Sequence, residues 1–181
     1  IEYNGEKPVY ETVTKPGTPV ALATNTAGVK ALRIPSSSTF GFSYDAAGAV
    51  QFRTQVSTTY DEHGQAITIE DLGNVVETDD DTCTTVTYAH SSSSALLDAY
   101  QVSLAASSET VAKACGAPVS RPADVIAATQ ATYDSSGRTL RSDTLDPTDG
   151  VGFVLGSEVT LYGVWGRPLE VKDAGGRLST V

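Results

Sequence analysis

Apolar and polar residues alternate along short stretches of the chain, most clearly in its first half. Val56, Thr58 and Tyr60 fall on one face of a predicted strand, and Ile67 and Ile69 share one face of the next strand. Successive side chains of a strand point to opposite faces, so this period predicts β-hairpins that each have one apolar side. An isolated hairpin is only marginally stable in water. We therefore expect each apolar side to be covered by another hairpin or another layer.

Turn signals separate the predicted strands at intervals of about 8 to 12 residues, which is typical of a meander or sandwich. Strands are expected around Val9 to Val13, Val20 to Ala23 and Val29 to Ile34, followed by a polar connector at Pro35–Ser38. The chain has 16 glycines, 8 tyrosines and no methionine. This usage favours short twisted strands over amphipathic helices. The sequence predicts an all-β fold of repeated antiparallel hairpins that form an extended sheet.

The unit Tyr-Asp-x-x-Gly recurs where predicted strands end. The Asp side chain can accept a hydrogen bond from the backbone N–H two residues on, and the Gly supplies the positive φ of a tight turn. We interpret the tyrosines as packing anchors and the glycines as turn formers. Half-copies without the Tyr occur at Asp71–Asn74 and Asp173–Arg177. The predicted structural residues are Tyr44, Asp45, Gly48, Tyr60, Asp61, Gly64, Tyr133, Asp134, Gly137, Arg138, Tyr162, Gly166 and Arg167.

Several Tyr-Asp-x-x-Gly units followed by Thr-rich strands resemble the YD repeats of bacterial Rhs proteins, toxin-complex C proteins and teneurins. Asp80–Ala89, Cys115 and Arg121–Ile126 look like a segment of the large Rhs-type proteins of actinobacteria. The resemblance covers residues 42–181. It implies a YD-repeat hairpin segment there, after an N-terminal β segment at residues 1–41. We expect both to form one continuous unit that is a fragment of a longer chain.

The resemblance implies a strip of hairpins that spirals into a shell. The function expected from it is a structural wall segment, not an enzyme, that encloses or presents a secreted toxin or effector. Its expected partners are the remainder of a longer Rhs-type chain, neighbouring copies and a toxin cargo. The expected localisation is secreted or at the cell surface. An alternative is an adhesion or glycan-binding module built on the same sheet, and a third is a self-processing aspartyl protease that cleaves near Asp146-Pro147.

Charge narrows the choice of partners. The chain carries 12 Lys and Arg against 22 Asp and Glu, a net charge of −10. Nucleic-acid binding needs clustered basic residues, and here they are scattered, so we expect no nucleic-acid partner. No run of 18 apolar residues occurs, so we expect no membrane span.

Candidate chemistry is sparse, and we expect no catalytic residue, cofactor or metal. His63 and His90 are interpreted as solvent-exposed turn residues, since no nucleophile signature accompanies them. Asp79–Asp81 lacks the spacing of a calcium loop and is interpreted as a solvated hairpin tip. Trp165 is either a packing plug between layers or a platform for stacking a sugar. No glycine-rich phosphate loop is present.

Two points stay open from the sequence. Cys83 and Cys115 lack metal-ligand spacing, and they either pair in an oxidising compartment or lie buried as separate thiols. Residues 89–132 allow two interpretations, because Leu97 and Leu104 fit a helical spacing while Tyr100, Val102 and Leu104 also alternate. We favour strand over a single helix here, with Pro118 and Pro122 preventing regular helix until a strand begins at Val125.

Overall fold

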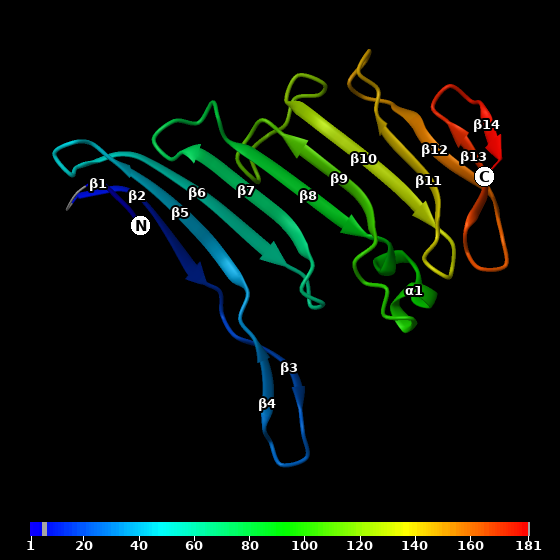
Figure 1. The fold of residues 1–181 in the computed structure, drawn as a ribbon, viewed down its shortest axis with the longest axis horizontal. Coiled ribbons are helices and arrows are strands. Elements are labelled where there is room, and N and C mark those ends of the chain that lie inside the picture. Colours follow the sequence, from blue (N-terminus) through cyan, green and yellow to red (C-terminus); the bar gives the residue numbers. More distant parts are fainter. Residues whose placement is uncertain (5–6, 181) are drawn as a thin grey trace. The chain divides into compact units, whose positions relative to one another are not determined.

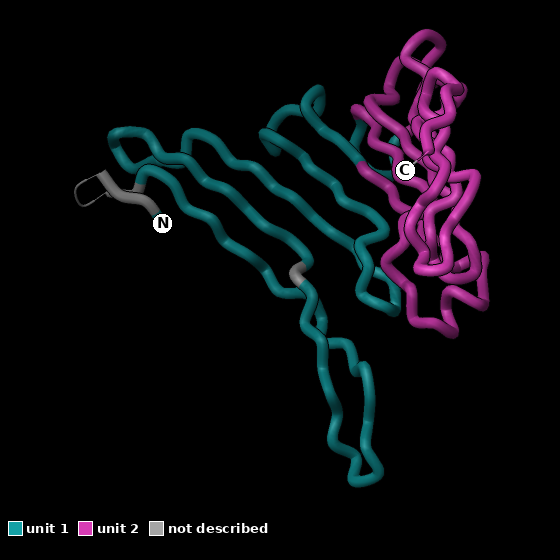
Figure 2. The backbone as a smooth tube through the Cα atoms, turned by 45° about the vertical axis from the view of Figure 1, so that its right-hand side comes forward, with its two compact units in different colours: residues 1–83, 113–117 teal, residues 84–112, 118–181 magenta. Residues whose placement is uncertain are grey.

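A computed structural model describes residues 1–4 and 7–180, and Gly5, Glu6 and Val181 lie outside the described residues. Antiparallel strands dominate it, which confirms the all-β prediction (Figure 1). The chain forms two compact units, one of Ile1–Cys83 with Lys113–Ala117 and the other of Thr84–Ala112 with Pro118–Val181 (Figure 2). The boundary expected between residues 41 and 42 stays a prediction.

Unit 1 contains a sheet in the order β1-β2-β5-β6-β7, with a separate hairpin of β3 and β4. Neighbouring strands pair in antiparallel fashion, and each strand of the main sheet follows its neighbour along the chain except where β3 and β4 intervene. The strands are β1 (Glu2–Asn4), β2 (Lys7–Pro16), β3 (Val20–Thr24), β4 (Lys30–Arg33), β5 (Ser36–Tyr44), β6 (Val50–Tyr60) and β7 (Ala66–Asn74).

The polar connector expected at Pro35–Ser38 is wrong, because β5 already begins at Ser36. Lys15 of β2 pairs with Ser38, and the Ser37 hydroxyl donates to the Lys15 carbonyl at 3.2 Å. Pairing with β2 satisfies the backbone groups of this segment, so its polar side chains do not prevent a strand.

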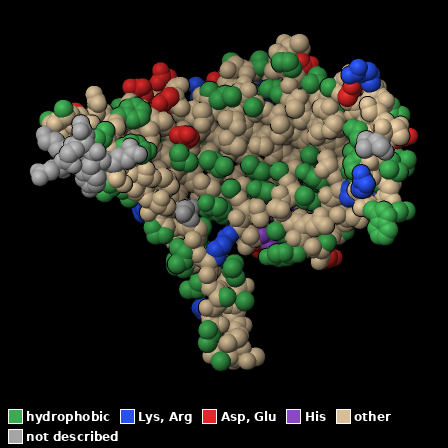
Figure 3. All heavy atoms as spheres, viewed as in Figure 1, with side chains coloured by type: hydrophobic (Ala, Val, Ile, Leu, Met, Phe, Trp, Pro, Cys, Tyr) green, Lys and Arg blue, Asp and Glu red, His purple; other side chains and the backbone are tan. Residues whose placement is uncertain are grey.

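The β3–β4 hairpin projects from the β2–β5 end of unit 1 and shows hydrophobic side chains on its surface (Figures 1 and 3). Leu22, Val29 and Leu32 have 57%, 66% and 55% of their surface exposed. The three strands expected from Val9 to Ile34 therefore form, but two of them lack a covering layer among the described residues.

Unit 2 contains a sheet in the order β9-β10-β11-β12-β13-β14, preceded by most of β8. Every strand from β9 to β14 pairs in antiparallel fashion with the next. The elements are β8 (Thr82–Tyr88), a 3-10 helix η1 (Ala89–Ser92), α1 (Ser94–Asp98), β9 (Ala105–Val111), β10 (Val125–Tyr133), β11 (Thr139–Leu145), β12 (Phe153–Tyr162), β13 (Pro168–Asp173) and β14 (Leu178–Thr180).

The strand favoured across residues 89–132 forms only in part, in β9 and from Val125 onwards, and the single helix that was the alternative is replaced by the short α1. Ser93 accepts the N–H of Leu96 and starts the five-residue α1. Tyr100 ends it with a φ of 56°, and the Gln101 N–H donates to the Leu96 carbonyl. This closure by a left-handed residue is a Schellman motif, which satisfies the last helical carbonyls and turns the chain back. Strand resumes in β9, and β10 begins at Val125 as predicted.

Buried hydrophobic residues gather where η1 and α1 lie against β9 and β10. Leu96 has 2% of its surface exposed and Val102 has 6%. Ala89, Leu96 and Tyr133 line the same small cavity, which places the helix over the end of β10. In unit 1, by contrast, Cys83 is the only hydrophobic residue that is buried among the described residues. The core of unit 2 is therefore small, and most large apolar side chains stay partly exposed.

Cys83 and Cys115 are joined by a disulfide, with a Cα–Cα distance of 5.0 Å. The Cys115 N–H also donates to the Glu70 carboxylate at 3.0 Å. These contacts attach residues 113–117 to unit 1, although the chain on either side of them belongs to unit 2. The sequence had left paired and separate cysteines open.

Candidate functional site

Among the described residues, six hairpin turns share one backbone geometry, and we name these five-residue segments the repeat turns. The N–H of the first residue donates to the carbonyl of the fifth, and the N–H of the fourth, a glycine, donates to the carbonyl of the first. All twelve of these N–O distances lie between 2.9 and 3.1 Å. The repeat turns are residues 25–29, 45–49, 61–65, 134–138, 163–167 and 173–177.

An aspartate at the first position strengthens the turn by accepting backbone N–H groups. Asp134 accepts the N–H of Ser136 at 2.9 Å and that of Arg138 at 3.0 Å. Asp45 does the same with Ala47 and Ala49. The sequence predicted the first bond of each pair. It missed the second, because that bond requires the chain to have already turned back.

The glycine and the tyrosine meet in a β-bulge. All six glycines have a φ between 72° and 88°. The strand register shifts between the tyrosine and the residue before it, so that Tyr60 pairs with Ala66 and Tyr133 with Thr139. A three-residue loop closed by a left-handed glycine produces this offset. The unit Tyr-Asp-x-x-Gly therefore fixes the turn and the register of the hairpin together.

Three of the repeat tyrosines reach back to the preceding strand of their sheet. Tyr44 in β5 donates its hydroxyl to Glu11 of β2 at 2.7 Å, and this bond raises the pKa of Tyr44, with burial contributing less. Tyr133 in β10 donates to the Ala105 carbonyl of β9 at 2.9 Å. Burial raises the pKa of Tyr133. These phenols join neighbouring strands through side-chain hydrogen bonds.

Tyr162 adds an arginine to this arrangement. Its hydroxyl donates to the Thr139 carbonyl of β11, and the Arg138 guanidinium lies 4.6 Å from its ring centroid. Asp134 holds that guanidinium, with its Oδ2 2.6 Å from Arg138 Nε. Desolvation opposes ionisation of Asp134, but bonds from the Arg138 backbone and side chain outweigh it and lower the pKa. The arginine of one repeat turn thus packs on the tyrosine of the next.

The turn at 61–65 obtains its arginine from a distant element. Gln65 stands where Arg138 stands in its own turn, and Arg33 of β4 instead donates to the Asp61 carbonyl at 3.4 Å. Its guanidinium carbon also lies 5.8 Å from the Tyr60 ring centroid. Sequence spacing could not find this contact, because 28 residues separate Arg33 from Asp61.

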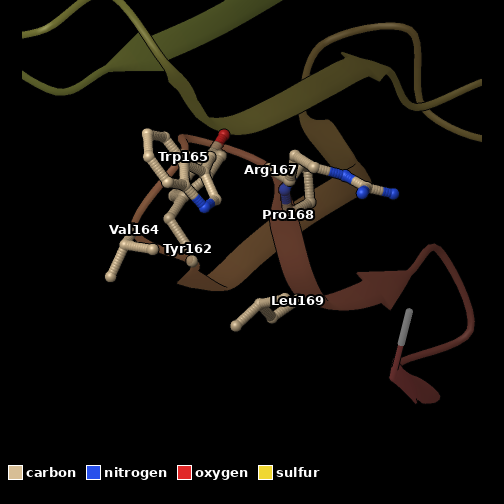
Figure 4. Close-up of a pocket in the computed structure, with 7 residues that line it drawn as sticks. Tyr162, Val164, Trp165, Arg167, Pro168 and Leu169 are labelled. Atoms are coloured by element: carbon tan, nitrogen blue, oxygen red, sulfur yellow. The ribbon is translucent and has the colours of Figure 1, made fainter.

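The turn at 163–167 differs from the others, because Gly163 replaces the aspartate. Trp165 is 89% exposed and Val164 is 95% exposed, so Trp165 is not the packing plug that was one expectation. The turn borders a pocket of about 540 Å³ whose labelled walls include Trp165, Tyr162 and Leu169 (Figure 4). Arg167 also lines it. Its backbone carbonyl accepts the Gly163 N–H, but its guanidinium forms no ion pair or hydrogen bond to any described residue.

Of the two predicted half-copies of the repeat, one does not form a turn and the other forms a complete repeat turn. Asp71–Asn74 lies inside β7, where the Gly73 N–H donates to the Asp71 carboxylate without reversing the chain. Its glycine stands two residues after the aspartate instead of three. Asp173, in contrast, forms a complete repeat turn with Arg177. The turn at 25–29 has asparagine in place of aspartate, and the Asn25 side chain accepts the same two N–H groups as aspartate does.

The remaining residues considered as candidates for chemistry are partly buried or accept hydrogen bonds from the backbone. The His63 side chain is only 19% exposed, so the expectation that it is a solvent-exposed turn residue is wrong. Asp81 is 6% exposed, so Asp79–Asp81 is not a wholly solvated tip, and the Asp80 carboxylate accepts the Asn74 N–H at 2.7 Å. Asp146 accepts the N–H of Thr148 within its own turn.

Among the described residues, no group of three or more His, Cys, Asp or Glu is placed to hold a metal ion. No helix among them has the length and apolar character that crossing a membrane requires. Neither a family model nor a curated protein matches this chain. The YD-repeat resemblance therefore stays a prediction.

Proposed function

We propose that this chain is a structural segment of a YD-repeat shell that encloses or presents a secreted toxin or effector. The observation that carries the proposal is the repetition of one turn geometry at six places, with an anchoring tyrosine before four of them. The residues of the repeat make hydrogen bonds within and between strands. These residues stabilise the sheet, and they do not share a reactive side chain.

The small number of buried side chains also supports the proposal of a wall segment. No large side chain among the described residues is fully buried, and apolar residues such as Val50 and Phe52 remain 54% and 42% exposed. A sheet with partly apolar faces needs further layers, further hairpins or an enclosed partner. Within this proposal the partners are the remainder of an Rhs-type chain of actinobacterial type, neighbouring copies and a cargo, and the shell is secreted or displayed at the cell surface.

The test is to isolate the native polypeptide that contains this segment with an antibody against residues 84–181. Peptide mass spectrometry then determines its full sequence, and limited proteolysis determines which part is protected. We expect further Tyr-Asp-x-x-Gly units and an unrelated C-terminal domain that resists protease until the repeats are denatured. A native polypeptide without further units, or with a C-terminal domain cleaved as quickly as in isolation, would contradict the proposal.

An adhesion or glycan-binding module is a second candidate, favoured by the exposure of Trp165 beside an apolar pocket. A glycan array tests it. Saturable binding that Trp165→Ala abolishes and Val76→Ala preserves would support this candidate, since Val76 is also largely exposed, at 83%, but does not line the pocket. An array without signal would remove it. A self-processing protease stays a third prediction, checked by incubating the pure chain and looking for a new terminus near Asp146.

A further inference from the structure

The β3–β4 hairpin of unit 1 carries basic and apolar side chains and no acidic one. No aspartate or glutamate occurs between Glu11 and Asp45. The charged residues of that segment are Lys15, Lys30 and Arg33. Figure 3 shows hydrophobic and basic side chains on the projecting hairpin. On a chain with a net charge of −10, the hairpin is therefore a local positive surface.

One face of β4 presents a cation beside an apolar side chain. Lys30 and Leu32 stand two residues apart in this strand, so their side chains share a face. Leu32 is 55% exposed, and Lys30 is exposed without an ion pair or side-chain hydrogen bond to any described residue. The hairpin is a two-stranded sheet of its own, in which every residue of β3 is exposed. Such a hairpin is only marginally stable in water, so a partner surface would stabilise it.

A surface of opposite charge lies in the same unit, in the loop at residues 76–80, which we name the acidic loop. It contains one glutamate and two aspartates, and all three are exposed. No lysine or arginine occurs anywhere between Arg53 and Lys113. The Arg53 guanidinium lies over the Phe40 ring, 5.1 Å from its centroid, and forms no ion pair with the described residues of the loop. The acidic loop therefore lacks a cation from its own part of the chain.

Hydrogen bonds hold the acidic loop in one shape. The Asn74 backbone N–H donates to the Asp80 carboxylate at 2.7 Å, and the Asn74 side chain donates to Glu77 at 3.0 Å. Asp79 has no ion pair or hydrogen bond to any described residue, and Val76 is 83% exposed. A carboxylate and an apolar side chain are therefore presented together, as an ammonium and an apolar side chain are on the hairpin.

The hairpin and the acidic loop lie at opposite ends of the main sheet of unit 1 (Figure 1). Arg33 at the end of β4 contacts the turn that follows β6. The acidic loop instead follows β7, whose last residue Asn74 pairs with Thr54 of β6. The strand from Thr54 to Tyr60 spans about 20 Å, and the hairpin extends away from the loop. The hairpin therefore does not reach the acidic loop of its own chain.

We propose that the β3–β4 hairpin of one copy docks on the acidic loop of a second copy of this chain. Lys30 then faces Asp79, and Leu32 packs on Val76. Charge complementarity selects this pairing, because two hairpins or two acidic loops would bring like charges together. The contact is heterologous, so copies join head to tail in an open chain. The inference rests on the proposed function, which names neighbouring copies as partners.

The test measures association of the chain by sedimentation velocity over a range of concentrations. The wild-type chain should form dimers and longer oligomers as its concentration rises. Lys30→Glu should weaken association about tenfold, because attraction becomes repulsion, and Asp79→Lys should do the same. Arg167→Glu and Asp98→Lys are matched controls, since they change the net charge equally at exposed positions of unit 2. Both controls should associate as the wild-type chain does.

Reversing both charges in one chain tests the pairing itself. A chain with Lys30→Glu and Asp79→Lys keeps the net charge of −10 and places a carboxylate on the hairpin and an ammonium on the acidic loop. It should recover most of the association that each single substitution loses. A wild-type chain that stays monomeric at about 1 mM would overturn the proposal. A double variant that associates as weakly as the single variants would overturn it as well.

Two further outcomes separate the alternatives. The segment between Tyr10 and Phe40 has no aromatic residue, which makes it unlike the proteins that anchor at a lipid interface. Sedimentation with phosphatidylserine vesicles, abolished by Lys30→Glu, would assign the hairpin to an anionic membrane and overturn the docking contact. The proposed function is decided by the native polypeptide. Further repeats in that polypeptide, together with a chain that does not associate, would overturn the contact alone.

Discussion

The fourth residue of each repeat turn has a backbone that L side chains rarely adopt, and neighbouring atoms differ from turn to turn. Gly48 has a φ of 88°, and a Cβ built on it would meet no atom within 4 Å. Gly64 has a φ of 87°, but its Cβ would stand 1.5 Å from Arg33 Nη1. The two positions therefore separate backbone strain from the loss of the Arg33 contact.

Gly48→Ala should lower the free energy of unfolding by about 1–2 kcal/mol, the cost of a left-handed conformation for an L residue. Gly64→Ala should cost more, because Arg33 must also leave Tyr60 and Asp61. Urea unfolding measures both values. Equal losses at the two positions would show that the Arg33 contact contributes nothing, and no loss at Gly48 would contradict the turn geometry.

Because the pKa values of two repeat aspartates are lowered, we expect the free energy of unfolding to depend on pH. The Asp173 pKa is lowered by the Arg177 backbone N–H and then by its guanidinium, and the Asp134 pKa is lowered as well. A carboxyl whose pKa is lowered in the folded state contributes stability above its unfolded pKa of about 3.9, and loses this contribution as the pH falls through the folded pKa.

Asp134→Asn keeps an acceptor oxygen, as Asn25 does in its own turn, but loses the charge that holds Arg138. At pH 7 we expect this variant to be less stable by about 0.5 kcal/mol, the scale of a surface ion pair. Urea titrations from pH 7 to pH 2 should show the difference disappearing below about pH 4. A constant difference across that range would assign the effect to turn geometry instead of charge.

At the scale of elements, the short helix α1 is stabilised by packing more than by its own length. Five residues are too few for a helix to be stable by itself in water. Ser93 caps its start, and Leu96 carries its buried contact with the sheet of unit 2. This dependence on one side chain explains why the hydrophobic spacing around Leu97 and Leu104 did not locate α1.

Leu96→Ala should destabilise the protein by about 2–4 kcal/mol, because it leaves a cavity beside Ala89 and Tyr133. Leu97→Ala is the matched control on the same helix, since Leu97 is 40% exposed and Leu96 is 2% exposed. We expect the control to change the free energy of unfolding by less than about 1 kcal/mol. Similar losses at both positions would contradict the packing of α1 through Leu96.

At the scale of the whole molecule, the disulfide is the covalent link between segments that alternate between the two units. Cys83 and Cys115 belong to unit 1, and residues 84–112 between them belong to unit 2. With few fully buried apolar residues, the protein has a limited core from which to gain stability. A cross-link that restricts the unfolded chain therefore has a large relative effect.

Replacing both cysteines by serine should lower the free energy of unfolding by about 3–4 kcal/mol, from the loop-closure entropy of a 32-residue separation. Urea unfolding with and without dithiothreitol measures the effect. The wild-type protein should shift with the reductant, and the double variant should not. A wild-type protein that is unaffected after complete reduction, verified by thiol titration, would contradict this role of the disulfide.

Local chemistry determined the turns and most strands from the sequence. A repeat turn forms within five residues, from an aspartate or asparagine acceptor and a glycine with positive φ, so Asp45–Gly48 and Asp134–Gly137 could be located without knowing the fold. The alternation that predicts an all-β fold is local in the same sense. Half-copies failed where spacing differed by one residue, as at Asp71–Asn74.

Tertiary structure decided whatever depends on residues far apart in the chain. Arg33 supports the turn at 61–65, Cys83 bonds to Cys115, and α1 forms where Leu96 finds a buried place. Trp165 could equally have been covered or exposed, and it is exposed. These outcomes depend on which strands become neighbours, because contact and burial arise only after the backbone has been brought together by pairing.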